Sequence, residues 1–121
     1  MLSSSLESIS DLSSLTKAQV DTLKIHLAVS KGAITMENAL RMRRNTGISR
    51  GTHYRVLAQA RKNLTESLFT VATAVQLGLV KPEEVEKLIS AVSLIPADVD
   101  QEKLPEVMAL VRLLASRIVM L

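Results

Sequence analysis

Basic side chains gather in one stretch of the chain without acidic neighbours. Residues 38 to 65 contain seven Arg or Lys and no Asp or Glu, whereas the rest of the 121-residue chain has eight basic and twelve acidic residues. A local excess of positive charge is typical of surfaces that bind polyanions, because neutralising phosphates releases counterions. A solvated helix face without a partner is the alternative that charge alone leaves open. The basic residues are Arg41, Arg43, Arg44, Arg50, Arg55, Arg61 and Lys62.

The residues needed for catalysis or metal binding are sparse. The chain has no Cys, and its two His residues, His26 and His53, lie on different predicted helices without carboxylates at helical spacing. It contains neither a Gly-x-Ser-x-Gly turn nor a phosphate-binding Gly-rich loop followed by Lys. We therefore expect no enzyme activity, no cofactor and no metal site. The lack of Cys also favours a reducing, cytoplasmic setting.

The elements that would position the basic residues are predicted to be helices. Apolar residues recur every three or four positions, and no window alternates as a half-buried strand would, so the fold class is all-α. Thr16 and Gln19 form a predicted capping box for a helix that stops near residues 31 and 32. A second, short helix begins after Thr35 and ends at residues 43 and 44.

A turn and a long helix follow. Asn45, Thr46 and Gly47 are turn residues, and the Ser49 hydroxyl can cap a helix that runs from residue 50 to about residue 79. Thirty residues at 1.5 Å each give a rod of about 45 Å, longer than a small domain needs to cover its own core. The length predicts either a kink or a partner helix.

Two more helices are predicted, over residues 83 to 92 and 102 to 121, with Pro105 in the first turn of the second. The last helix is apolar around most of its circumference, which predicts burial against a second copy. It is too short and too charged to span a bilayer, so we expect no membrane association. Residues 1 to 14 lack the features of a targeting signal and are predicted to be a flexible lead-in.

The stretch from Gly47 to Leu57, GISRGTHYRVL, resembles the turn and the start of the recognition helix in helix-turn-helix transcription regulators. The resemblance covers roughly residues 16 to 62. It implies that the chain binds double-stranded DNA, with the long helix entering the major groove. One position departs from the pattern, because His53 stands where a buried aliphatic residue is usual. Either the helix is rotated so that residues 56, 57 and 60 face inward, or His53 is buried with its hydrogen bonds satisfied.

The resemblance also implies roles for individual residues. Arg50 would read a guanine edge, and Ser49, Thr52 and the helix N-terminus would bind phosphate oxygens. Gly51 would let the backbone approach a phosphate closely. The remaining candidates would face the groove or flank the phosphate backbone; they are His53, Tyr54 and Arg55 at the groove, and Arg41, Arg43, Arg44, Arg61 and Lys62 along its rims.

These inferences give a three-part organisation and a function. Residues 1–14 are a lead-in, residues 15–80 a DNA-binding unit with an extended third helix, and residues 81–121 a helical pair for oligomerisation. The predicted protein is a homodimeric, nucleoid-associated transcription regulator, paired through residues 64–121, whose recognition helices enter successive major grooves about 34 to 36 Å apart. Two alternatives remain open: a non-specific DNA-organising or partition protein, and a helical protein-interaction module that binds an acidic protein partner. A small-molecule effector in an apolar pocket is a further open question.

Overall fold

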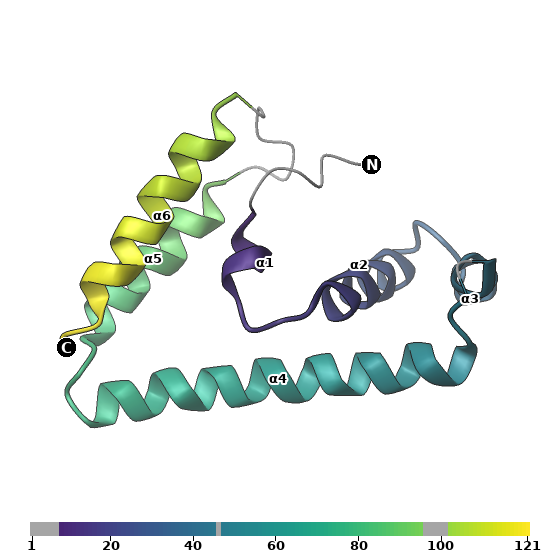
Figure 1. The fold of residues 1–121 in the computed structure, drawn as a ribbon, viewed down its shortest axis with the longest axis horizontal. Coiled ribbons are helices and arrows are strands. Elements are labelled where there is room, and N and C mark those ends of the chain that lie inside the picture. The colour runs from purple at the N-terminus through teal and green to yellow at the C-terminus, as the bar shows by residue number, and fades with distance from the viewer. Residues whose placement is uncertain (1–7, 46, 96–101) are drawn as a thin grey trace. The chain divides into compact units, whose positions relative to one another are not determined.

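The computed structural model describes residues 8–45, 47–95 and 102–121, and all regular structure in these ranges is α-helical (Figure 1). The all-α prediction is therefore confirmed. The helices are α1 (Ile9–Leu12), α2 (Lys17–Ser30), α3 (Met36–Asn45), α4 (Arg50–Gln76), α5 (Pro82–Ser93) and α6 (Leu104–Ile118).

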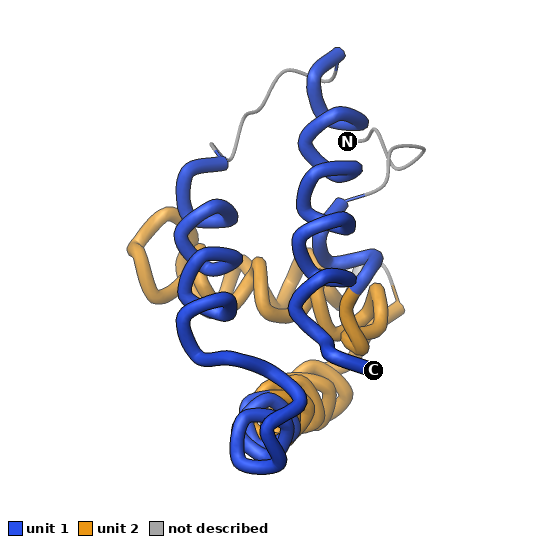
Figure 2. Tube along the Cα trace, turned by 90° about the vertical axis from the view of Figure 1, so that its left-hand side faces the viewer, with its two compact units in different colours: residues 1–12, 68–121 blue, residues 13–67 orange. Residues whose placement is uncertain are grey.

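The chain divides into two compact units, and the boundary between them lies inside α4 (Figure 2). Residues 13–67 form one unit, with α2, α3 and the first part of α4. Residues 1–12 and 68–121 form the other. The sequence places boundaries after residues 14 and 80 instead. The end of α4 belongs with α5 and α6 because the Leu79 carbonyl, just beyond α4, accepts a hydrogen bond of 2.9 Å from the Met120 amide.

The predicted helix starts in the first of these units are confirmed by their capping contacts. Thr16 Oγ1 accepts the Gln19 amide and Gln19 Oε1 accepts the Thr16 amide, each at 3.1 Å, which completes the capping box of α2. Thr35 Oγ1 accepts the Asn38 amide at 3.1 Å at the start of α3. These side chains satisfy amides that have no partner within the helix.

Gly47 ends α3 by taking a left-handed conformation with φ 88°. The following amide, of Ile48, donates to the Arg43 carbonyl at 2.8 Å, which is the six-to-one bond of a Schellman motif. A residue with a Cβ would be strained at this φ. The predicted turn at Gly47 is thus confirmed. It allows α4 to begin at Arg50, shortly after α3 ends at Asn45.

The core of residues 13–67 is small and partly polar. Its buried side chains come from all three helices and are Thr22, Ala39, Leu40, Arg43, His53 and Ala60. A second polar cluster joins α4 to the first turn of α2 and to the residues before it. Asn63 Nδ2 donates to the Ser14 carbonyl at 3.0 Å and to Gln19 Oε1 at 3.2 Å. These contacts fix which side of α4 faces inward.

The other unit contains an α5–α6 pair, and the two helices lie side by side (Figures 1 and 2). Val80, Met108, Val111 and Ile118 are its buried apolar residues. Pro82 and Pro105 each stand in the first turn of their helix, as the sequence predicts. Helix α6 is shorter at both ends than the predicted 102–121.

One helix is absent from the prediction. α1 is a single turn within residues 1 to 14, which the sequence assigns to a flexible lead-in. It is stabilised locally, because the Asp11 carboxylate accepts the Ser8 amide at 2.8 Å and the Ser8 hydroxyl at 3.3 Å. A turn held by side-chain contacts of this kind has too few apolar residues to produce a helical pattern in the sequence.

Candidate nucleic-acid interface

The N-terminus of α4 is exposed and capped. Ser49 Oγ accepts the Thr52 amide at 3.1 Å and donates to Thr52 Oγ1 at 2.9 Å. The His53 amide makes the first backbone bond, to the Ser49 carbonyl at 2.9 Å. The amides of Arg50 and Gly51 precede this bond, and amides in that position point outward from the end of a helix. With the positive end of the helix dipole they can bind an anion.

Gly51 is exposed in this first turn, and a Cβ built on it would meet no other atom within 4 Å. The open space means that folding does not require a glycine here. A role for Gly51 in letting another molecule approach the backbone closely is therefore compatible with its surroundings, and it stays a prediction.

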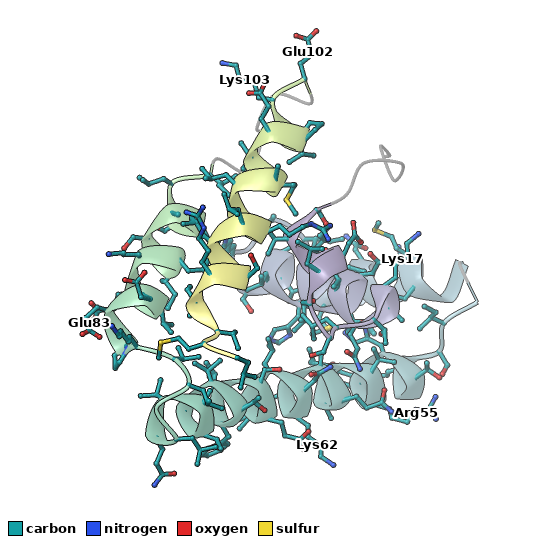
Figure 3. The ribbon with its side chains drawn as sticks, turned by 60° about the vertical axis from the view of Figure 1, so that its left-hand side comes forward. Lys17, Arg55, Lys62, Glu83, Glu102 and Lys103 are labelled. Atoms are coloured by element: carbon teal, nitrogen blue, oxygen red, sulfur yellow. The ribbon has the colours of Figure 1, made fainter. Side chains whose placement is uncertain are left out.

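The exposed cations of α4 lie away from its buried residues on two sides of the helix, with Arg55 and Lys62 opposite them and Arg50 and Arg61 on one flank. His53 and Ala60, seven residues apart, define the inner face. Arg55 and Lys62 have the same spacing two positions later, and Figure 3 shows both extending from one side of α4. Arg50, Tyr54 and Arg61, at intervals of four and seven residues, are exposed as well. The outer face of the first half of α4 is therefore basic.

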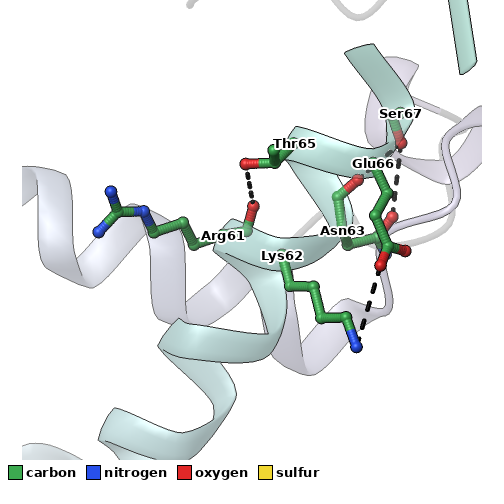
Figure 4. Close-up of polar contacts among 6 residues, drawn as sticks. All are labelled: Arg61, Lys62, Asn63, Thr65, Glu66 and Ser67. Carbon is green, nitrogen blue, oxygen red and sulfur yellow. Dashed lines mark hydrogen bonds and ion pairs between the residues drawn. The ribbon is translucent and has the colours of Figure 1, made fainter. Parts of the chain in front are cut away.

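Two of the candidate cations are held by acidic side chains just outside the acid-free stretch. Arg41 contacts Glu37 at 3.3 Å. Figure 4 shows the second pair, in which Lys62 contacts Glu66 at 3.9 Å. Both pairs span four residues on exposed helix surface, where ion pairs contribute little and exchange readily. Glu37 and Glu66 directly flank the acid-free stretch, so the count of charges within that stretch does not include them. Their spacing of four residues from a cation is the signal that finds them.

Arg43 is in the interior and not at a phosphate-binding surface, which corrects the expectation for this residue. Its side chain is 5% exposed, and Nη2 donates to Thr22 Oγ1 at 2.7 Å. A buried guanidinium joining α3 to α2 is a structural contact. Sequence spacing did not reveal this role, because Arg41 and Arg43 look alike in sequence. The side chain of Arg44 lies outside the described residues.

His53 is also in the interior, so it cannot reach a base. It is fully buried, its ring meets Tyr54 edge to face at 5.3 Å, and neither ring nitrogen has a hydrogen-bond partner. Burial, and then the charges of Arg43 and His26, lower the pKa of the His53 imidazole from its ordinary 6.5. The structure confirms that His53 is buried but not that its hydrogen bonds are satisfied, and Ala60, which the alternative places on the inner face, is buried as well. Tyr54, 40% exposed, is the neighbour that faces outward.

The remaining candidates are together on the surface of one unit. Ser49, Arg50, Thr52, Tyr54, Arg55, Arg61 and Lys62 lie on the first half of α4 or at its cap, and Arg41 lies on α3. No cluster of three or more His, Cys, Asp or Glu side chains able to hold a metal occurs in the described part of the chain. Within the same residues, no helix has both the length and the apolar character needed to cross a bilayer.

Comparison of the chain with models of known protein families, with curated proteins and with solved structures gave no match.

Proposed function

We propose that this protein binds double-stranded DNA with the first half of α4 in the major groove. The observation that carries the proposal is the basic outer face of α4, where Arg50, Arg55 and Arg61 are exposed beside a capped helix N-terminus. An α-helix fits the major groove, and cations along its sides meet phosphates on both rims.

The exposed residues divide into two groups by their position along α4. Arg50, in the first turn, is the candidate for a bidentate contact to a guanine, with Tyr54 one turn further on. Arg55, Arg61 and Lys62 are candidates for phosphate contacts, which raise affinity for all sequences. The Arg50 and Gly51 amides and the Thr52 hydroxyl would complete a phosphate site at the helix end.

The biological role that this surface supports best is transcription regulation at a two-fold DNA site. An arginine in the first turn of the groove helix favours base reading over purely non-specific binding. A DNA-organising protein would use the same cations without discrimination between sequences. An adaptor that binds an acidic protein would use them without DNA.

The test is titration of the full chain with a labelled random 30-base-pair duplex, followed by fluorescence anisotropy at several salt concentrations. Arg55→Gln removes one proposed phosphate contact, and Arg117→Gln removes an exposed arginine of α6 as the matched control. The proposal expects a steep salt dependence whose slope falls by about one unit in Arg55→Gln and is unchanged in Arg117→Gln.

Other outcomes separate the alternatives. Selection of a preferred duplex from a random pool, with at least about 1,000-fold tighter binding than to unrelated duplexes, supports the regulator. Equal affinity for all duplexes leaves DNA binding in place and rejects base reading. No binding at low salt rejects the DNA proposal and favours an acidic protein as the partner.

A further inference from the structure

The second half of α4 carries no charge on any face. No Asp, Glu, Lys or Arg occurs between Glu66 and Lys81, a run that includes the last ten residues of the helix. Helix surfaces that face water normally carry charged residues, and helices without them are covered. This segment belongs to the unit formed with α5 and α6.

That unit covers only one side of the segment. Ala74 and Val75 are half-buried and Val80, just after the helix, is buried. In contrast, Leu68 is 72% and Phe69 69% exposed. These two large apolar side chains lie next to each other on a segment without charged residues, which distinguishes them from the scattered exposed leucines common on protein surfaces.

Helical spacing groups Leu68 and Phe69 with two smaller exposed residues into one outward patch, whereas Leu77, 67% exposed, lies just beyond the end of α4. Ala72 is four residues after Leu68 and three after Phe69, and Gln76 follows four residues later, so Ala72 is the centre of the patch. Both Ala72 and Gln76 are exposed. A small residue surrounded by two large apolar ones and an uncharged amide lets a second helix approach closely at that point. We call Leu68, Phe69, Ala72 and Gln76 the α4 patch.

We propose that the α4 patch is the contact between two copies of this chain, related by a two-fold axis that passes near Ala72. In a two-fold contact each surface meets itself, so residues near the axis face their own counterparts. A charge there would meet an identical charge, which is unfavourable, and a patch with no charge avoids this. A charged partner would gain no complementary ion pair from it.

Two other exposed apolar residues of this unit, one on each of its remaining long helices, fit a self-contact less well. Ile89 on α5 is three residues after Glu86, and Leu113 on α6 is four residues before Arg117, so each shares a helix face with a charge. Pairing either surface with itself would bring charges together or remove them from water. The proposal narrows the predicted pairing region, residues 64–121, to one face of α4, and it does not depend on DNA binding.

The experiment measures the mass of the full chain by sedimentation velocity, without DNA, across a concentration series. The wild-type chain is expected to reach twice its 13.2 kDa. Ala72→Glu and Ala72→Lys each place like charges at the axis and are expected to weaken association by at least about tenfold. A 1:1 mixture of the two variants is expected to regain the dimer, because opposite charges then face each other.

Ala115→Glu is the matched control, because Ala115 is an exposed alanine of α6 in the same unit. It is expected to leave the dimer intact. Recovery in the mixture shows that both variants fold, since unfolded chains would not pair selectively. A monomeric wild-type chain at high concentration overturns the proposal. A dimer that persists in both Ala72 variants also overturns the proposal. The same holds if Ala115→Glu weakens the dimer as much as the Ala72 variants do.

Discussion

The two halves of α4 form one continuous helix but have opposite surfaces. The first half carries Arg50, Arg55, Arg61 and Lys62 outward and packs a partly polar core inward. The second half has no charge and leaves Leu68 and Phe69 exposed. A helix of 27 residues, about 40 Å long, therefore presents two surfaces of different chemistry. The distribution of charge along the helix distinguishes these two surfaces, which the periodicity of its apolar residues does not.

The largest expected effect concerns the polar core beneath the first half of α4. Arg43→Ala removes the bond to Thr22 and leaves a cavity and a buried hydroxyl, so it should lower the free energy of unfolding by about 2–4 kcal/mol. Urea unfolding followed by circular dichroism measures this, with the exposed Arg55→Ala as control, expected within about 0.5 kcal/mol of wild type. Equal midpoints for the two variants would mean that Arg43 is not a structural residue.

The next effect concerns the proposed contact between Arg50 and a DNA base. Once a preferred duplex is known, Arg50→Ala should lose about 1–3 kcal/mol of discrimination at one base pair, because a bidentate guanine contact disappears. Binding to unrelated duplexes should change much less. Competition titrations with duplexes altered at single positions give the measurement. A uniform loss over all duplexes would assign Arg50 to phosphate contact instead.

A pH effect follows from the burial of His53. Its lowered pKa means that the folded chain keeps the imidazole neutral while the unfolded chain takes up a proton near pH 6.5. The unfolded state then binds more protons, so the free energy of unfolding should fall as the pH drops below 6.5. The fall should level off below the pKa of the folded state. The groups that face His53, Arg43 and His26, act in the same direction.

Unfolding at pH 7.5 and pH 5.5 tests this effect, with His53→Leu as the comparison. The variant should retain stability better on acidification, because leucine has no proton to bind. An identical pH dependence in both chains would show that other groups account for it.

The smallest effect concerns the acidic residues beside the basic face. Glu66→Gln should cost at most about 0.5 kcal/mol of stability, because the pair with Lys62 is exposed. The variant should also bind DNA slightly more tightly. Without the Glu66 carboxylate, Lys62 has no ion pair to break before it contacts a phosphate. Glu83→Gln, on exposed surface of α5, is the control for the change in net charge. Weaker DNA binding in Glu66→Gln alone would indicate that Glu66 positions Lys62 for its contact.

Local signals in the sequence were enough to predict most of the helices. The caps at Thr16, Thr35 and Ser49 and the left-handed turn at Gly47 depend on contacts within a few residues, and the structure confirms them. The site was less predictable. Arg41 and Arg43 are two residues apart with the same chemistry, yet one is exposed and the other is buried.

The sequence by itself determined the all-α class, the turn before α4 and the concentration of positive charge, because these depend on residue type and short-range spacing. Only the tertiary structure decided which candidates reach the surface. Arg43 is buried against α2, where its partner Thr22 is 21 residues away, and contacts over that separation leave no periodic trace in the sequence. The boundary between the two units inside α4 also depends on contacts between residues far apart in the sequence. The last turns of this helix belong to the unit that contains α5 and α6.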